Sequence, residues 1–489
     1  MPLWARVGVI FYFSFYQFLA PALALAFSYD SVPYSYAAVF VQGLYIFLLL
    51  LPFLFYKREF GWLHPLMLPS ILSAVKSIVK TPQQLIDPFS LSPVSFQAVT
   101  GSSAYSLRSL SESAIVEVGI ELTLLYCFAL AIYYLAYFWG PKFRAPRIAF
   151  SSPTRMQIKC LVIVAAVVLV CSAFIISRGG LTAQILAMRG GRSAAFSGYG
   201  QFGVLADIAI ATMLAWYALD SRAVRSPLFW ISLIAAMLNN LAIAGSRSSL
   251  IMPSVMFVMI WWLHEGRARI IPAIGMVFVA LIFFGLIGIL RQDFSSSKVD
   301  WSILSIERMD EWLTAAQQEA QKRRGEESDL AAFAGVENAG LLLGRTYVGA
   351  LAFWVPRAVW PDKPRSADSY NMYVNFAGRQ VGDQFETRVW GIPVGPQVEA
   401  FWNFHIPGVV LVFGLYGAFH RWLANLLSTH PRAAAIWVVY SFLLVNFNAT
   451  SISFSDSIRQ VAFLIILFAF LGAIKFSNQH SAGKVSATY

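Results

Sequence analysis

The sequence has few charged residues and few cysteines. Asp, Glu, Lys and Arg together make up 12% of its 489 residues, about half of their usual share in soluble proteins. The three cysteines, Cys127, Cys160 and Cys171, all lie in apolar stretches, so neither face of the protein has the cysteines for a disulfide framework. The shortage of charge excludes an ordinary soluble domain.

Motifs for nucleotide and metal chemistry are also missing. The sequence has no P-loop, no G-x-G-x-x-G and no G-x-S-x-G, so chemistry driven by ATP or another nucleotide is not indicated. The predicted outer loops hold no D-x-D pair, and no His/Cys/Asp cluster has the spacing of metal ligands. We therefore expect no metal and no cofactor. A reaction outside the membrane would need a donor that is already activated.

Long apolar runs are what the sequence does have. Hydrophobic residues make up 58% of the chain, and the mean hydropathy is +0.63. Runs such as "CLVIVAAVVLVCSAFII" and "VFVALIFFGLIGIL" approach the roughly 20 residues that a helix needs to cross a bilayer. The sequence predicts an all-α polytopic membrane protein with about 12 transmembrane helices. These are expected to begin near Val7, Ser35, Trp62, Ala114, Ile158, Gly200, Pro227, Ser248, Ile271, His405, Ala433 and Ile458.

The distribution of basic residues predicts the topology. Lys and Arg concentrate in loops such as Gly140 to Lys159, which the positive-inside rule assigns to the cytoplasm together with both termini. The net charge of +11 therefore reports topology and not nucleic-acid binding. We expect residues 1–290 to hold the first nine transmembrane helices, residues 291–396 a large outer loop, residues 397–476 the last three helices, and residues 477–489 a cytoplasmic tail.

The large outer loop has two parts. Its first part, "ILSIERMDEWLTAAQQEAQKRRGEESDL", has apolar residues at helical spacing among mixed charges, which predicts an amphipathic helix on the outer surface. Its second part, "GLLLGRTYVGALAFWVPRAVWP", is apolar but interrupted by Pro356 and Arg357. A re-entrant or membrane-surface helix is expected there, because broken backbone is tolerated at membrane depth only inside protein or beside a wet cavity.

Several arginines are predicted at the outer membrane–water boundary, where the positive-inside rule should deplete them. Each one alone can snorkel to lipid headgroups or pair with a carboxylate. As a group they suit a ligand with a fixed negative charge, because guanidinium groups form bidentate hydrogen bonds with phosphate. A lipid-linked pyrophosphate is the predicted ligand, since its headgroup lies at this depth. The group comprises Arg247, Arg291, Arg345, Arg357 and Arg459, and Arg178 in a short outer loop is a further candidate.

Glu399 is the candidate general base. It precedes the tenth predicted helix and lies among the aromatic residues Trp402 and Phe404, a setting that can raise the pKa of a carboxyl group and let it accept a proton. His405 is a rival base, although a single His at a helix start is more often structural. The other acids near the outer boundary are expected to be buried and paired with arginines; they are Glu117, Glu121 and Asp207.

Two longer motifs resemble a known family. "GRTYVGALAFWVPRAVWPDKPRS" and "GIPVGPQVEAFWNFHIPGVVLVFGLYG" are similar to motifs of the O-antigen and exopolysaccharide repeat-unit polymerases, the Wzy type. The resemblance rests on Pro356, Arg357, Trp360, Pro361, Lys363 and Pro364, and then on Glu399, Asn403, Phe404 and Gly408. The "AGSRSSLI" stretch around Arg247 also resembles a short Gly-Ser-Arg turn of this family. His405 stands where a glycine is usual.

The resemblance implies a metal-independent, inverting glycosyltransferase with a GT-C-like membrane fold. It would lie in the bacterial inner membrane with its active site and its large loop facing the periplasm. There it would transfer a growing glycan from undecaprenyl diphosphate to the non-reducing end of a lipid-linked oligosaccharide repeat unit, in O-antigen or exopolysaccharide biosynthesis. The expected partners are undecaprenyl diphosphate-linked oligosaccharides and membrane lipids, with a chain-length regulator and a flippase as candidates.

The residues and the resemblance together assign roles. Glu399, Arg357 and Arg247 are the predicted catalytic residues. The predicted substrate-binding residues are Arg178, Arg291, Arg345, Tyr347, Lys363, Asn403, His405 and Arg459. Four tryptophans are candidates for stacking on sugar rings, although tryptophans at this depth more often anchor the protein at the interface; they are Trp354, Trp360, Trp390 and Trp402.

Other functions fit parts of the same pattern. An O-antigen ligase has the same donor and topology but transfers the glycan to lipid A core, and the "PR…WPDKP" run favours the polymerase. A transporter or flippase of lipid-linked sugars would need charged groups throughout the interiors of its helices, whereas the charges here crowd the outer boundary. A purely structural role in an export complex leaves the arginine group unexplained.

Overall fold

The described part of the chain is almost entirely helical. The computed structural model describes residues 3–19, 22–23, 35–55, 61, 63–71, 73, 112–141, 149–150, 155–189, 200–244, 248–266, 275, 308–311, 324–352, 355, 359–364, 395–431, 433–446, 464–471 and 474–475. Within these ranges the extended structure is one short antiparallel pair, in which β1 (Ala149–Phe150) lies beside β2 (Ile474–Lys475).

The helices have the following bounds. The first half of the chain holds α1 (Leu3–Phe11), the π-helix η1 (Tyr12–Leu19), α3 (Ser35–Leu54), the 3₁₀ helix η2 (Pro65–Met67), α8 (Glu112–Trp139), α9 (Met156–Ser177), α10 (Gly180–Arg189), α12 (Gly200–Leu219), the 3₁₀ helix η3 (Ala223–Arg225) and α13 (Pro227–Ala244). The second half holds α14 (Ser248–Glu265), α17 (Arg324–Ala339), α18 (Arg345–Leu351), α20 (Pro396–Thr429) and α21 (Ala434–Asn446).

Most predicted helix starts agree with these bounds. Among the described residues, four helices are long and apolar enough to cross a membrane; they are α3, α8, α9 and α20. Shorter apolar helices include α12, α13 and α21. The predicted helix from Ile271 lies largely outside the described residues, and of the one from Trp62 the structure describes η2 and a few helical residues after it. The membrane character is supported, and the number of twelve helices stays a prediction.

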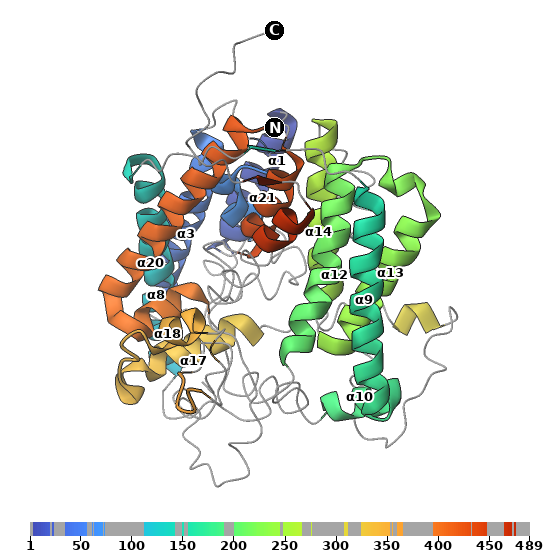
Figure 1. Cartoon of the computed structure of the whole chain (residues 1–489). Coiled ribbons are helices and arrows are strands. Elements are labelled where there is room, and N and C mark those ends of the chain that lie inside the picture. Colours follow the sequence, from blue (N-terminus) through green and yellow to red (C-terminus); the bar gives the residue numbers. More distant parts are fainter. Residues whose placement is uncertain are drawn as a thin grey trace, which may run out of the picture.

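The first group of helices is built on α8 and α20, which pack side by side (Figure 1). Their backbones approach so closely at Gly417 that a Cβ atom there would overlap the carbonyl oxygen of Tyr133. Both α3 and α17 also pack against α8. The α17 helix covers the end of the predicted amphipathic segment and continues beyond it to Ala339. Its buried side chains, such as Leu330 and Val336, belong to the main hydrophobic core.

The second group consists of α9, α10, α12, α13 and α14 (Figure 1). Aromatic side chains join these helices: Phe174 of α9 stacks on Phe202 of α12, with ring centroids 4.0 Å apart. Tyr217 of α12 stacks on Phe257 of α14 at 4.4 Å. These are ordinary contacts between apolar helix faces.

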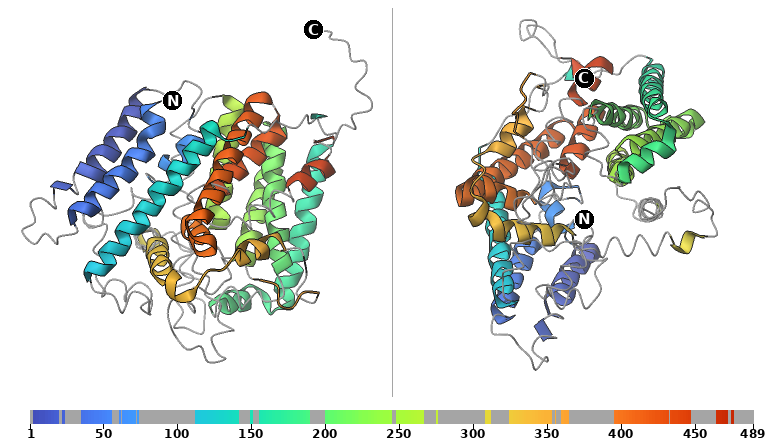
Figure 2. Two further views of the ribbon diagram at one scale, coloured as in Figure 1. Left: turned by 90° about the vertical axis from the view of Figure 1, so that its left-hand side faces the viewer. Right: turned by 90° about the horizontal axis from the view of Figure 1, so that it is seen from below.

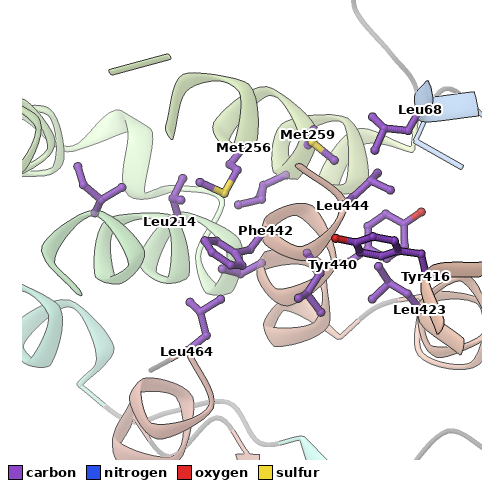
Figure 3. Close-up of a cluster of buried hydrophobic side chains, with 14 of the residues drawn as sticks. Leu68, Leu214, Met256, Met259, Tyr416, Leu423, Tyr440, Phe442, Leu444 and Leu464 are labelled. Carbon is purple, nitrogen blue, oxygen red and sulfur yellow. The ribbon is translucent and has the colours of Figure 1, made fainter. Parts of the chain in front are cut away.

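The α21 helix lies between the two groups (Figure 3). Its Tyr440 points toward Tyr416 of α20, while Phe442 points toward Leu214 of α12. All four side chains are buried in one continuous hydrophobic cluster. Burial of such apolar surface is the main favourable contribution to the packing of these helices.

Several segments that were predicted to be cytoplasmic meet at one end of the molecule. Lys159 Nζ donates a hydrogen bond to the carbonyl of Leu471, at 3.2 Å. The Arg421 guanidinium donates to the carbonyls of Phe138 and Gly140, at 3.0 and 3.1 Å. The strands β1 and β2 pair at this end, whereas α10, α17 and α18 lie at the opposite end (Figures 1 and 2).

Candidate active site around Glu399

A sharp bend divides α20 just after Glu399. Phe404 and His405 leave the helical conformation, and His405 has φ 58° and ψ −149°, a combination that is essentially restricted to glycine. The bend presses Gly408 so closely against the earlier segment that a Cβ atom there would overlap the Ala400 carbonyl oxygen. Residues 396–403 therefore form a short helical segment that is set apart from the long apolar helix after it.

A loop before α18 satisfies the carbonyl groups that the bend leaves open. The backbone N–H of Leu342 donates to the Trp402 carbonyl at 3.0 Å, and that of Leu343 donates to the Asn403 carbonyl at 3.1 Å. In return, Trp402 Nε1 donates to the Gly340 carbonyl at 3.1 Å. Because buried backbone groups need partners, the loop and the bend stabilise each other.

Gly344 fixes where α18 begins. Its φ of +83° is unfavourable for other residues, and a Cβ atom there would lie 2.8 Å from Phe404 Cζ. The next two residues, Arg345 and Thr346, are thereby brought beside the segment that carries Glu399. Two regions some fifty residues apart in the sequence thus form one site.

Glu399 lies in a buried polar cluster with Thr346 and Asn403, and the three residues are 5%, 1% and 0% exposed. Asn403 Nδ2 donates to Thr346 Oγ1 at 2.8 Å and to the backbone carbonyl of Glu399 at 2.9 Å. Asn403 thus links the Thr346 hydroxyl to the helical segment that carries Glu399. A buried carboxyl group needs such partners, because burial removes it from water.

Two tyrosines complete the surroundings of the carboxyl group. Glu399 lies near enough to Tyr347 and Tyr416 to interact electrostatically with both. The Tyr347 ring stacks on Phe404, with centroids 6.4 Å apart. Burial in the first place, and then the charge of Glu399, raises the pKa of Tyr347 well above its ordinary value. Tyr347 therefore stays a neutral phenol that can donate a hydrogen bond.

Asp329 of α17 holds the start of α20. One of its carboxylate oxygens accepts a hydrogen bond from the Gly395 N–H, and the other accepts one from the Tyr126 hydroxyl at 2.7 Å. A Cβ atom at Gly395 would lie 2.6 Å from Asp329 Oδ2, so glycine is needed for this contact. The sequence reasoning missed both Asp329 and Thr346, since neither stands in a pattern that marks it.

The other predicted residues in the described part of the site have different surroundings. Arg345 is exposed, and its guanidinium makes no ion pair or hydrogen bond with another described side chain. Lys363 Nζ donates to the carbonyls of Val355 and Ala352, at 2.9 and 3.4 Å, and so caps the end of α18. His405 is exposed and packs on the Phe401 ring, with centroids 4.1 Å apart.

Arg178 is not in this cluster. It ends α9 in the second helix group, with its guanidinium carbon 5.7 Å from the centroid of the Phe174 ring. The remaining predicted site residues lie outside the described residues; they are Arg247, Arg291, Arg357 and Arg459, together with Trp354 and Trp390. Their predicted roles stay predictions.

Two predictions are wrong. Glu117 and Glu121, expected to be buried and paired, are both exposed on α8. Trp402 is 1% exposed, so its ring is not available to stack on a sugar. The third acid, Asp207, is half-buried and accepts a hydrogen bond from Asn240 Nδ2 at 2.9 Å.

No family model, curated protein or solved structure matches this chain. Within the described ranges, no group of three or more His, Cys, Asp and Glu side chains is placed to hold a metal ion. The function is therefore inferred from the residues and geometry around Glu399.

Proposed function

We propose that this protein is a polysaccharide polymerase with a GT-C-like fold. It transfers a growing glycan from undecaprenyl diphosphate to the non-reducing end of a lipid-linked repeat unit, at the periplasmic face of the bacterial inner membrane. The observation that carries the proposal is the buried Glu399 carboxyl group, in a polar cluster with Asn403 and Thr346, the residue that follows the exposed Arg345 in the chain.

Glu399 acts as the general base. It takes the proton from a hydroxyl group of the acceptor sugar, and the freed oxygen attacks the anomeric carbon of the donor glycan. The bond between that carbon and the diphosphate oxygen breaks as the new glycosidic bond forms on the opposite face, so the configuration inverts. The products are the lengthened glycan on the acceptor lipid and undecaprenyl diphosphate.

Arg345 meets the negative charge that develops on the leaving diphosphate. A guanidinium group matches phosphate oxygens in a bidentate manner and needs no rearrangement during the reaction. The exposed position of Arg345 at the start of α18 suits a ligand that arrives from outside the protein. Arg357 and Arg247 are the further arginines that we propose for this role.

The surroundings of Arg345 suit a lipid-borne donor. Leu343, Val348 and Leu351 flank it in the chain and expose their apolar side chains, with Leu343 71% exposed. Exposed apolar groups beside a cation are typical of a segment at the membrane–water boundary. The polyprenyl chain of the donor would lie along these side chains, with its diphosphate at Arg345.

The arrangement of the two ends supports the proposed sidedness. The basic segments predicted to be cytoplasmic meet at the end opposite α17 and α18 (Figure 1). If the basic end faces the cytoplasm, as the positive-inside rule requires, the Glu399 cluster lies at the periplasmic end.

The proposal is tested by incubating the purified protein with lipid-linked repeat units extracted from the cells that produce it. We expect a ladder of longer glycans without added nucleotide and in the presence of EDTA. Transfer of glycans only to added lipid A core would indicate the ligase instead. Movement of the lipid-linked sugar across vesicles without any ladder would indicate a transporter. Either result contradicts the polymerase.

A further inference from the structure

The first segment of α20, which carries Glu399, is held at both ends. At its start, the Gly395 N–H donates a hydrogen bond to a carboxylate oxygen of Asp329, a residue of α17. At its end, the loop that follows α17 donates backbone hydrogen bonds to the carbonyls of Trp402 and Asn403, at 3.0 and 3.1 Å. One stretch of the predicted outer loop, made of α17 and the loop after it, therefore supplies both attachments.

The attachment at the start reaches Glu399 through one turn of helix. The Glu399 N–H donates to the Gly395 carbonyl at 3.0 Å, so the residue that Asp329 holds also accepts the hydrogen bond from the Glu399 backbone. Gly395 is the N-cap of α20 and has no side chain that could accept a hydrogen bond there. A carboxylate beside a helix N-terminus is favourable because the helix dipole is positive at that end. Asp329 supplies this carboxylate from another helix.

Asp329 is itself fixed by its surroundings. Its second carboxylate oxygen accepts a hydrogen bond from the Tyr126 hydroxyl of α8 at 2.7 Å, and its side chain is buried. On the same helix, the Phe333 ring packs on Phe401 with centroids 4.9 Å apart. A Cβ atom at Gly395 would lie 2.6 Å from Asp329 Oδ2, so the backbone and the carboxylate are in close contact. The position of α17 is thereby transmitted to the start of α20.

We propose that Asp329 is a positioning residue for Glu399: by holding Gly395 it places the first turn of α20, so that docking of α17 determines where the Glu399 carboxyl group lies. The role in catalysis rests on the proposed function, whereas the attachment of the segment rests on the hydrogen bonds alone. A misplacement of about 1 Å can slow a reaction by about 10²-fold, so a residue that does not touch the substrate can still control the rate.

The first test needs no substrate. Hydrogen exchange of the purified full-length protein in detergent, followed by mass spectrometry, measures the protection of the peptide that covers residues 395–403. In Asp329→Ala we expect this peptide to exchange about tenfold faster or more, the effect of losing a hydrogen bond to a charged group. Asp329→Asn keeps a side-chain oxygen that accepts from the Gly395 N–H and should retain most of the protection. Wild-type exchange in the folded alanine variant overturns the proposal.

The second test separates kcat from KM for the lipid-linked donor, below the unfolding temperature of every variant. In Asp329→Ala we expect kcat to fall by about 10 to 10²-fold with KM nearly unchanged, because the substrate contacts remain while the base is misplaced. Asp329→Asn should restore most of kcat. The control is Val336→Ala, which truncates another buried side chain of α17 and leaves the carboxylate in place. Equal losses of kcat in the control and in Asp329→Ala, or in the asparagine and alanine variants, overturn the proposal.

Gly395→Ala tests the same contact from the other side and serves if Asp329→Ala does not fold, as judged by thermal unfolding. Its Cβ atom must displace the Asp329 carboxylate, so we expect faster exchange of the segment and a lower kcat. The matched control on the same helix is Gly414→Ala, whose Cβ atom meets no atom within 4 Å and should change neither. Wild-type exchange and kcat in folded Gly395→Ala overturn the proposal.

The two readouts distinguish this proposal from the proposed function. Faster exchange in the variants, together with a wild-type protein that forms no glycan ladder, supports the attachment through Asp329 and rejects the polymerase. A glycan ladder together with unchanged exchange and kcat in the variants supports the polymerase and rejects the role of Asp329.

Discussion

Both helix groups bury amides and hydroxyls, but among the described residues only the first group also buries acids. In the second group (α9, α10, α12, α13 and α14), the buried polar residues are amides and hydroxyls, such as Gln184, Asn240 and Thr212. Among the described residues, the two buried acids are Asp329 and Glu399, and both lie where α17 meets the start of α20. A buried carboxyl group is costly unless it is held by partners, so its presence marks a site more strongly than a buried amide does.

The two groups also differ in how their helices meet and in the regularity of the backbone near the buried acids. The helices of the second group meet through stacked aromatic rings and apolar faces. The first group contains a bend with a left-handed residue at His405 and a loop hydrogen-bonded to that bend. In the first group the strained residue His405 and the buried acid Glu399 thus lie in the same helix, as expected where strain serves a function.

The largest structural effect is expected at the bend. Gly408→Ala places a Cβ atom against the Ala400 carbonyl oxygen, and overpacking of this kind costs about 1–3 kcal/mol of stability. The matched variant in the second group, Gly203→Ala, meets no atom within 4 Å and should stabilise α12 by roughly 0.5–1 kcal/mol. Thermal unfolding in detergent measures both. Equal effects of the two substitutions would contradict the comparison.

Asp329→Ala removes the acceptor for the Gly395 N–H and the Tyr126 hydroxyl. Losing hydrogen bonds to a charged group costs about 1.5–3 kcal/mol, so we expect a lower unfolding temperature. The control is Glu117→Gln, which changes an exposed acid on α8 and should leave the unfolding temperature unchanged. If both variants unfold at the wild-type temperature, Asp329 does not hold the start of α20.

Arg345→Ala should affect the donor more than the fold. Because the residue is exposed, its loss should change stability by no more than about 0.5 kcal/mol. Losing hydrogen bonds to a charged group corresponds to about a tenfold or greater rise in KM for the lipid-linked donor. Arg222→Ala, an exposed arginine at the opposite end, serves as the control. A KM equal to that of the control would remove Arg345 from the proposed site.

His405→Gly should have the smallest effect. The φ and ψ values of His405 suit glycine, and relief of such backbone strain is worth about 1 kcal/mol. The variant should therefore unfold at a slightly higher temperature in the same assay. A lower temperature would contradict this prediction and mean that the packing of the His405 ring against Phe401 outweighs the strain.

The sequence predicted the helices better than the site. Long apolar runs give the starts of α3, α12 and α13 at the expected residues, because each run must be buried in protein or lipid. Glu117 and Glu121 were misplaced because their i, i+4 spacing shows that they share a face, but not which face. The prediction of Glu399 as a buried carboxyl group is confirmed, since aromatic neighbours in sequence were enough to indicate burial.

The contacts that hold Glu399 could not be predicted. The bond between Thr346 and Asn403 joins residues 57 positions apart, and nothing in the local pattern of either residue indicates the other. Asp329 lies in a segment that contains several charged residues, so nothing in the sequence distinguishes it from the other acids there. These contacts depend on the bend at His405. The direction that the chain takes after this bend is set by tertiary packing and cannot be read from the local sequence.

The most direct test of the proposed function compares glycan ladders formed by Glu399→Gln and Glu337→Gln. Both substitutions replace a carboxyl group by an amide, but Glu337 is exposed on α17. Loss of a general base should slow polymerisation by roughly 10² to 10⁴-fold in Glu399→Gln, while Glu337→Gln should match the wild type. A ladder formed at the wild-type rate by Glu399→Gln would contradict the account.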